Sequence, residues 1–131
     1  TDYFLGANDQ IACIPMIETK QAVERLDEIL AVPGIDAVYV GPADLSITYG
    51  LPPGMNNGSP FEEARVLIAK KCGEHGITAG IHANASLAAK HAAAGYRMIT
   101  ISGDAVAIPL QAQADLKVAR GAAEGQKAVY G

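Results

Sequence analysis

Apolar segments alternate with amphipathic segments along the whole chain. Four apolar runs predict β-strands, at residues 11–18, 36–40, 77–82 and 97–102. The first run, IACIPMIE, is nearly continuous, which is typical of a strand buried on both faces of a parallel sheet. Gly, Pro or polar residues follow each run, so short strands are predicted.

The segments between these runs have helical spacing. Thr19 is predicted to cap a helix over residues 20–32, where apolar residues recur every three or four positions. Further helices are predicted over residues 61–76, 85–95 and 104–123. Residues 49–60 are rich in Gly, Pro and Asn and predict a loop, which we expect to form part of a lid or a subunit contact.

The order of predicted elements is βαβαβαβα, which favours a parallel sheet with right-handed helical crossovers. Two architectures fit this order: a small open doubly wound sheet, or four consecutive units of a (β/α)₈ barrel. A complete barrel needs about 250 residues, so this chain corresponds to about half of one. In both architectures ligands bind at the carboxyl ends of the strands. We predict a single segment, residues 1–131, without an internal domain boundary.

Composition narrows the class of protein. Hydrophobic residues make up 50% of the chain and charged residues 18%, which is typical of globular α/β proteins. The net charge of −4 gives no electrostatic reason to expect nucleic acid or a membrane surface as a partner. No apolar run approaches the roughly 20 residues that span a bilayer, and no signal-peptide pattern is visible. Cys13 and Cys72 are predicted to be reduced and buried, and we expect a cytoplasmic protein.

Two carboxylates follow consecutive predicted strands. Glu18 ends the first strand, and Asp44 follows the second, 26 residues later. Alone, each has an ordinary explanation: Glu18 as an acid in the first turn of a helix, and Asp44 as a helix N-cap. Together they lie at equivalent exits of strands about 4.8 Å apart, where they repel each other unless a cation lies between them. Carboxylate oxygens favour a hard divalent cation such as Mg²⁺ or Mn²⁺.

The other polar residues near the strand ends have two interpretations each. His82 ends the third strand, either as a substrate contact or proton relay, or as a hydrogen-bonded residue at the rim. Ser102 and Asp104 follow the fourth strand, and capping of the last helix is favoured over a place in the site. His75 and His91 lie in predicted helices and are expected at the surface.

The segment IPMIETKQAVERLDEILAVPGIDAVYVGPADLS, residues 14–46, closely resembles the HpcH/HpaI aldolases, class II pyruvate aldolases related to the citrate lyase beta subunit. The later segments GITAGIH and GYRMITISGDAVAI extend the resemblance over essentially the whole chain. The resemblance implies the C-terminal half of a TIM barrel, with four βα units. It implies a divalent metal (Mg, Mn or Co) held by Glu18 and Asp44. It also implies substrate binding by the turn that contains Gly41, Pro42, Ala43 and Asp44.

The activity implied by the resemblance is the reversible cleavage of a 2-keto-4-hydroxy acid to pyruvate and an aldehyde. In the family, an arginine and a histidine essential to catalysis lie in the N-terminal half of the barrel, and the enzymes are usually hexamers. Partners expected from the resemblance are therefore the keto acid, further copies of the chain and the N-terminal half. Met16 is a departure, because many members have a glutamine there.

Three alternatives to a pyruvate aldolase remain. One is a related lyase or decarboxylase that acts on keto acids or CoA thioesters, although no CoA-binding device is visible. Another is a small open α/β binding domain. The third is an inactive half-barrel, and the isolated segment itself is expected to lack activity because it lacks the N-terminal arginine and histidine.

Overall fold

The computed structural model of the protein describes residues 2–129, with side-chain surroundings to residue 121. The chain divides into two compact units between Ile101 and Ser102. Each unit is described by itself. The prediction of a single segment, residues 1–131, stays a prediction.

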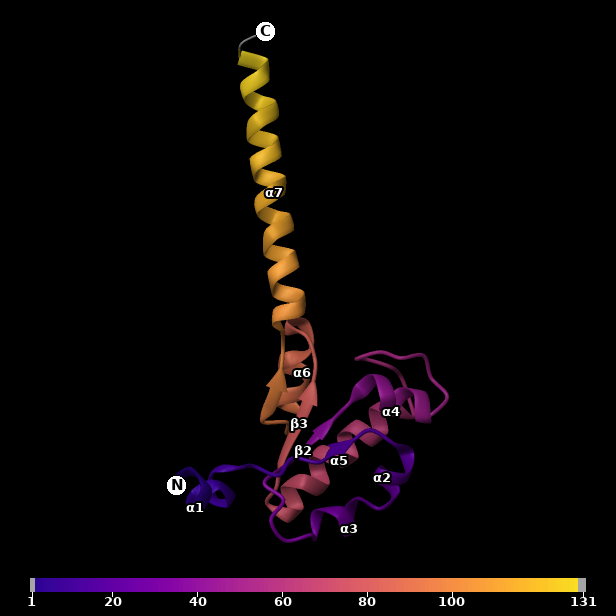
Figure 1. The fold of residues 1–131 in the computed structure, drawn as a ribbon. Helices are drawn as coiled ribbons and strands as arrows, with labels where there is room; N and C mark the ends of the chain where they lie inside the picture. Colours follow the sequence, from indigo (N-terminus) through magenta and orange to yellow (C-terminus); the bar gives the residue numbers. More distant parts are fainter. Residues whose placement is uncertain (1, 130–131) are drawn as a thin grey trace. The chain divides into compact units, whose positions relative to one another are not determined.

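The first unit is built on a sheet of four parallel strands in the order β1-β2-β3-β4. The strands are β1 (Met16–Ile17), β2 (Ala37–Val40), β3 (Thr78–His82) and β4 (Met98–Thr100). The helices of this unit are α1 (Asp2–Gln10), α2 (Lys20–Glu24), α3 (Leu26–Leu30), α4 (Pro42–Thr48), α5 (Phe61–His75), the 3₁₀ helix η1 (Ala85–Leu87) and α6 (Ala88–Ala93). The predicted parallel sheet with helical crossovers is confirmed (Figure 1).

The two faces of the sheet have different surroundings. In the strand register, Ile17 pairs with Val40 and Val40 with Ile81, and all three side chains are fully buried. They belong to the hydrophobic core, which also contains Phe61 and Ile68 from α5. The alternate residues form the row Met16, Tyr39, Gly80 and Met98. Because side chains alternate along a strand, this row lies on the opposite face.

The prediction of a doubly buried first strand over residues 11–18 is wrong. Only Met16 and Ile17 form β1, and Met16 is 51% exposed. Hydrogen bonds from Asp36 N–H to the carbonyl of Cys13 and from Tyr39 N–H to the carbonyl of Pro15 continue the pairing with β2. β1 is an edge strand of the described sheet, so no strand pairs with its other side. Pro15, just before β1, has no N–H to donate to such a partner. The prediction that Cys13 is buried is wrong, because its side chain is exposed, whereas the predicted burial of Cys72 is confirmed.

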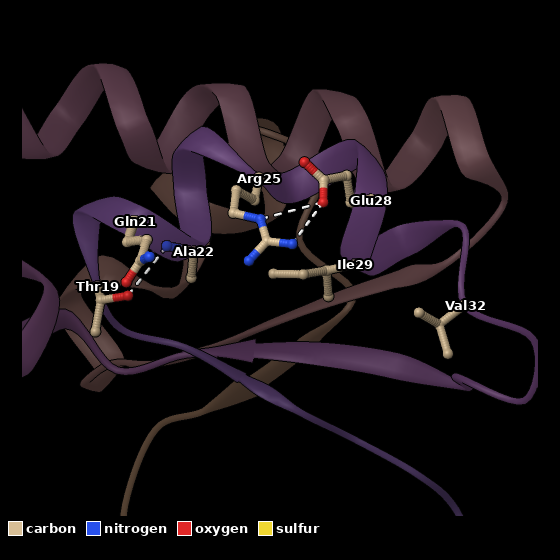
Figure 2. Close-up of a pocket in the computed structure, with 7 residues that line it drawn as sticks. All are labelled: Thr19, Gln21, Ala22, Arg25, Glu28, Ile29 and Val32. Carbon is tan, nitrogen blue, oxygen red and sulfur yellow. Dashed lines mark hydrogen bonds and ion pairs between the residues drawn. The ribbon is translucent and has the colours of Figure 1, made fainter.

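The predicted helix over residues 20–32 is two helices, because the backbone leaves the helical region at Arg25 (φ −107°, ψ 22°). The predicted cap is confirmed: Thr19 Oγ1 accepts a hydrogen bond of 3.0 Å from Ala22 N–H. Arg25 pairs with Glu28 at 2.7 Å on the outer side of these helices, where a pocket is open to solvent (Figure 2). Its only charged lining residues, Arg25 and Glu28, bind each other, so we assign it no function.

The second unit contains α7 (Asp104–Val129), a single unbroken helix (Figure 1). It begins at the predicted residue, and Asp104 Oδ1 accepts a hydrogen bond of 2.7 Å from Ala105 N–H. The helix continues past the predicted end at residue 123 and through Pro109. Within the part of the chain that the structure describes, no helix is long and apolar enough to cross a membrane.

Gly80 lies under a side chain that crosses its strand. The hydroxyl of Tyr39 on β2 donates a hydrogen bond of 2.7 Å to Oγ1 of Thr100 on β4. Because β3 lies between these two strands, the tyrosine side chain passes over β3. A Cβ at Gly80 would lie 2.8 Å from Tyr39 Cδ2 and 2.5 Å from Met98 Cε. It would also lie 3.0 Å from the carbonyl oxygen of Val38, which is backbone. Glycine is required at this crossing.

We predict that Gly80→Ala lowers the free energy of unfolding by about 1–3 kcal/mol, because the added methyl overpacks a fixed contact. Gly73→Ala is the matched control, since a Cβ there meets nothing within 4 Å and the site is an exposed position of α5. The control is expected to gain up to about 1 kcal/mol from helix propensity. Urea denaturation of both variants measures the difference. Equal shifts in the two variants would contradict the crossing geometry.

Candidate active site at the carboxyl ends of the strands

A pocket of about 440 Å³ lies at the carboxyl ends of the strands. Its lining residues come from β1, β2, the turn into α4, the following loop and the end of β3: Met16, Tyr39, Gly41, Pro42, Ala43, Asp44, Pro53, Gly54, Met55 and His82. The structure thus brings the predicted substrate-binding turn and His82 to one pocket. Their roles in binding and catalysis stay predictions.

Glu18 lies against the turn that carries Asp44. A Cβ on Gly41 would be 3.0 Å from Glu18 Oε2, 3.3 Å from Glu18 Cβ and 3.2 Å from Met16 Cε. Any larger residue at position 41 would therefore push the Glu18 side chain away. Gly41 therefore allows the carboxylate of Glu18 to approach the backbone of the turn, three residues before Asp44.

Asp44 lies in the first turn of α4, which starts at Pro42 with Gly41 as its N-cap. The interpretation of Asp44 as a helix N-cap is therefore wrong. Pro42 has no N–H, and the N–H groups of Ala43 and Asp44 have no acceptor within the helix because they belong to its first turn. The buried hydroxyl of Ser46 donates a hydrogen bond of 2.6 Å to the carbonyl of Pro42 and fixes this turn.

The carboxylates of Glu18 and Asp44 form no salt bridge within residues 2–121. In the same part of the chain, no three His, Cys, Asp or Glu side chains are grouped as metal ligands.

Residues 4–109 match the HpcH/HpaI aldolase/citrate lyase family, which is most of the chain. The protein belongs to the HpcH/HpaI family. The resemblance seen in the sequence is thereby confirmed.

Characterised relatives carry aldolase names. A hydroxypyruvate/pyruvate aldolase from Paraburkholderia phytofirmans is 36% identical over 104 residues, covering 79% of this chain and 40% of the relative. A 4-hydroxy-2-oxo-heptane-1,7-dioate aldolase from Escherichia coli is 34% identical over 116 residues, covering 86% of this chain and 43% of the relative. The chain thus spans about two fifths of the length of these curated relatives.

A solved structure supports the fold assignment. An HpcH/HpaI aldolase/citrate lyase family protein from Burkholderia cenocepacia superposes with a TM-score of 0.80 and 32% identity. The match covers 91% of this chain and 46% of the other. The predicted fold class, four parallel βα units of a TIM barrel, is confirmed.

The loop over residues 49–60, which was expected to form part of a lid or a subunit contact, contributes one wall of the pocket. Pro53, Gly54 and Met55 line it, and none carries a charge. Asn57 Nδ2 donates hydrogen bonds of 2.8 Å to Ser46 Oγ and to the carbonyl of Pro52. The dense Gly, Pro and Asn content of residues 49–60 predicted a loop but not which of its side chains face the pocket.

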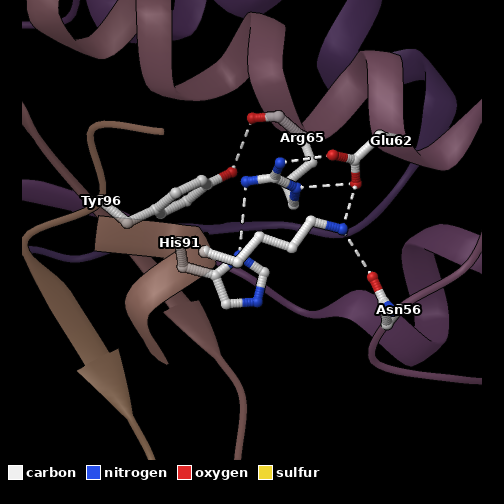
Figure 3. A network of polar contacts seen from close by, with 6 residues as sticks. Asn56, Glu62, Arg65, His91 and Tyr96 are labelled. Atoms are coloured by element: carbon white, nitrogen blue, oxygen red, sulfur yellow. Dashed lines mark hydrogen bonds and ion pairs between the residues drawn. The ribbon is translucent and has the colours of Figure 1, made fainter. Parts of the chain in front are cut away.

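The expectation that His91 is a surface residue is wrong. His91 is fully buried, and its Nδ1 lies 3.4 Å from Arg65 Nη1 (Figure 3). The almost fully buried Arg65 is paired with Glu62, and its carbonyl accepts a hydrogen bond of 2.8 Å from the hydroxyl of Tyr96. Lys90 joins the same group, donating to Glu62 at 3.1 Å and to Asn56 at 2.7 Å. These residues connect α5 with α6 and with the loop beside the pocket.

This network shifts the acidity of its members. The hydrogen bond from Arg65, aided by Lys90, lowers the pKa of Glu62 to about 2. Burial lowers the pKa of His91, and the charges of Arg65 and Lys90 lower it further. Because an arginine side chain can only donate, a hydrogen bond between Arg65 and His91 requires Nδ1 to be the acceptor.

We predict that Glu62→Gln weakens the dependence of the free energy of unfolding on pH at acid pH. The folded-state pKa of Glu62 is depressed, so its contribution to the free energy of unfolding is present above about pH 4.5 and is lost as the pH falls toward about 2. Denaturant midpoints measured between pH 7 and pH 2 test this. Glu63→Gln, which removes the neighbouring exposed acid, is the control and should retain the steep wild-type limb. If both variants flatten the acid limb equally, the assignment of this pH dependence to Glu62 and its network is refuted.

Proposed function

We propose that the protein is part of a divalent-metal-dependent pyruvate aldolase. The reaction is the reversible cleavage of a 2-keto-4-hydroxy acid into pyruvate and an aldehyde. The observation that carries the proposal is the approach of Glu18 to Gly41, at the turn that places Asp44 in a pocket with His82. The family and the aldolase names of the relatives support the reaction class.

The residues at this turn fit a hard divalent cation such as Mg²⁺, Mn²⁺ or Co²⁺. Glu18 and Asp44 would hold it, because both offer carboxylate oxygens and neither is paired with a basic side chain within residues 2–121. A cation bound there supplies Lewis-acid polarisation of a keto oxygen. Two protein ligands leave positions for water and for a chelating substrate.

The remaining steps fall to residues of the protein. The N–H groups of Ala43 and Asp44, directed outward from the first turn of α4, bind the substrate carboxylate. When the bond between C3 and C4 breaks, the 4-hydroxyl loses its proton and becomes the aldehyde carbonyl, and C3 gains a proton to give the methyl group of pyruvate. His82, on the same pocket, contacts the aldehyde half of the substrate.

The active enzyme needs more than this chain. The row Met16, Tyr39, Gly80 and Met98 lies on the face that a barrel turns inward, and β1 and β4 are edges of the described sheet. We propose that four further βα units complete the barrel and supply the missing arginine and histidine, and that the complete protein forms a homo-oligomer, a hexamer as in the family. Exposed strand edges would otherwise promote association.

We predict that Glu18→Gln and Asp44→Asn each weaken Mn²⁺ binding by about 100-fold in the complete barrel, since each removes one of two anionic ligands. Isothermal titration calorimetry measures the affinity, and circular dichroism checks that the fold is retained. Aldol cleavage should be lost in both variants. Glu24→Gln, an exposed acid on α2, is the control and should bind Mn²⁺ as the wild type does. Wild-type turnover that persists after complete metal removal would refute the proposal.

We predict that His82→Ala changes the relative kcat/KM among aldehydes by about 10-fold and leaves pyruvate enolisation largely intact. His75→Ala is the matched control, because His75 lies on α5 and binds Asp27 on α3 at 3.1 Å, outside the pocket. Enolisation is followed as exchange of the pyruvate methyl protons in D₂O. Equal losses for every aldehyde and for enolisation would assign His82 to proton transfer or to structure instead.

A further inference from the structure

We propose that the segment Pro53–Met55 determines which aldehyde the pocket accepts, and that Asn57 is the positioning residue that holds this segment in place. The favoured substrate class is an aldehyde with an uncharged, apolar substituent. This inference rests on the proposed aldolase function and extends it to the second product of the cleavage.

The segment is fastened to the same turn that carries the candidate metal ligand. Asn57 Nδ2 donates to Ser46 Oγ, and Ser46 Oγ donates to the carbonyl of Pro42. The same amide also donates to the carbonyl of Pro52, directly before the segment. One side chain therefore fixes both the start of the wall and its distance from the first turn of α4.

Two further contacts hold the segment from other elements. Lys90 on α6 donates a hydrogen bond of 2.7 Å to Asn56 Oδ1, and the amide of Asn84, the N-cap of η1, lies 3.9 Å from Met55 Sδ. Met55 is consequently bracketed by contacts at its own sulfur and at the two asparagines that follow it. A loop held from three elements presents a defined surface to a ligand, as substrate discrimination requires.

The position of the segment assigns it to the aldehyde half. The proposed function places the carboxylate and keto oxygens of the substrate at Ala43 and Asp44. The rest of the substrate then extends toward the other lining residues, which include Pro53, Met55 and His82. The thioether of Met55 packs well against apolar groups of varied shape. A charged substituent would lose water against this wall and gain no counter-charge from it.

The test uses the complete barrel and two aldehydes of equal chain length, butanal and its carboxylate analogue 4-oxobutanoate. We expect the wild type to favour butanal. Met55→Ala should lower kcat/KM for butanal about 10-fold, with a smaller effect on 4-oxobutanoate, because the lost contact is apolar. Met55→Lys should reverse the preference by supplying a counter-charge. Deuterium exchange into pyruvate is the reference reaction, and the change in kcat/KM for butanal should exceed any change in exchange in both variants.

Asn57→Ala should reproduce the shift of Met55→Ala, mainly through a higher KM for butanal, although Met55 itself is intact. Asn56→Ala is the matched comparison: it removes the exposed contact with Lys90 but keeps both hydrogen bonds of Asn57, so its shift should be smaller, below about 3-fold. Equal losses for both aldehydes and for deuterium exchange in Asn57→Ala would mean a structural role only, and would overturn the assignment of Asn57.

The Met55 variants keep the test decisive if Asn57→Ala fails to fold. An unchanged ratio of butanal to 4-oxobutanoate in both Met55 variants, with normal deuterium exchange, would overturn the inference and leave the aldolase proposal intact. A wild-type barrel without metal-dependent exchange or cleavage would instead refute the aldolase proposal itself, and the inference with it.

Discussion

The in-register parallel pairing of the four strands is the constraint on which the pocket depends. It aligns Ile17, Val40 and Ile81 in one buried row and leaves the alternate residues on the opposite face. A slip of one residue would exchange these rows and bury Glu18 among the core residues. The hydrophobic core therefore determines where the carboxylates lie. The same pairing leaves room for glycine alone at position 80, because the side chain of Tyr39 crosses the strand there.

The sequence predicted the features that follow from periodicity and from residues with few backbone options. The order of the four strands, the Thr19 cap and the start of α7 at Asp104 agree with the structure, whereas α1 before the first strand was not predicted. The grouping of His82 with the turn at residues 41–44 was also predictable, because carboxyl ends of parallel strands meet at one edge of a sheet. These predictions use local patterns or general rules of α/β topology, and they need no knowledge of individual side-chain contacts.

The remaining features depend on contacts between residues far apart in the chain. His91 occupies an alanine-rich helix, and only its position against Arg65 and Tyr96 makes it a core residue. The bend at Arg25 is marked by neither Pro nor Gly. The exposure of Met16 depends on what covers the face of the sheet opposite the hydrophobic core. The amino-acid pattern around Met16 does not show which elements lie there. The wall formed by Met55 was missed because Gly and Pro in a loop specify its turns but not the direction of its side chains.

The number of residues between paired strands also determines the entropy lost when each pair of strands forms. Gly80 and Met98 are 18 residues apart and Met16 and Tyr39 are 23 apart, whereas Tyr39 and Gly80 are separated by 41. Closing the longest of these loops costs about 0.7 kcal/mol more conformational entropy than closing the shortest. The central pairing, β2 with β3, is thus the least favoured to nucleate. The packing of α5 against β3, if formed first, would shorten the free chain that this pairing has to close.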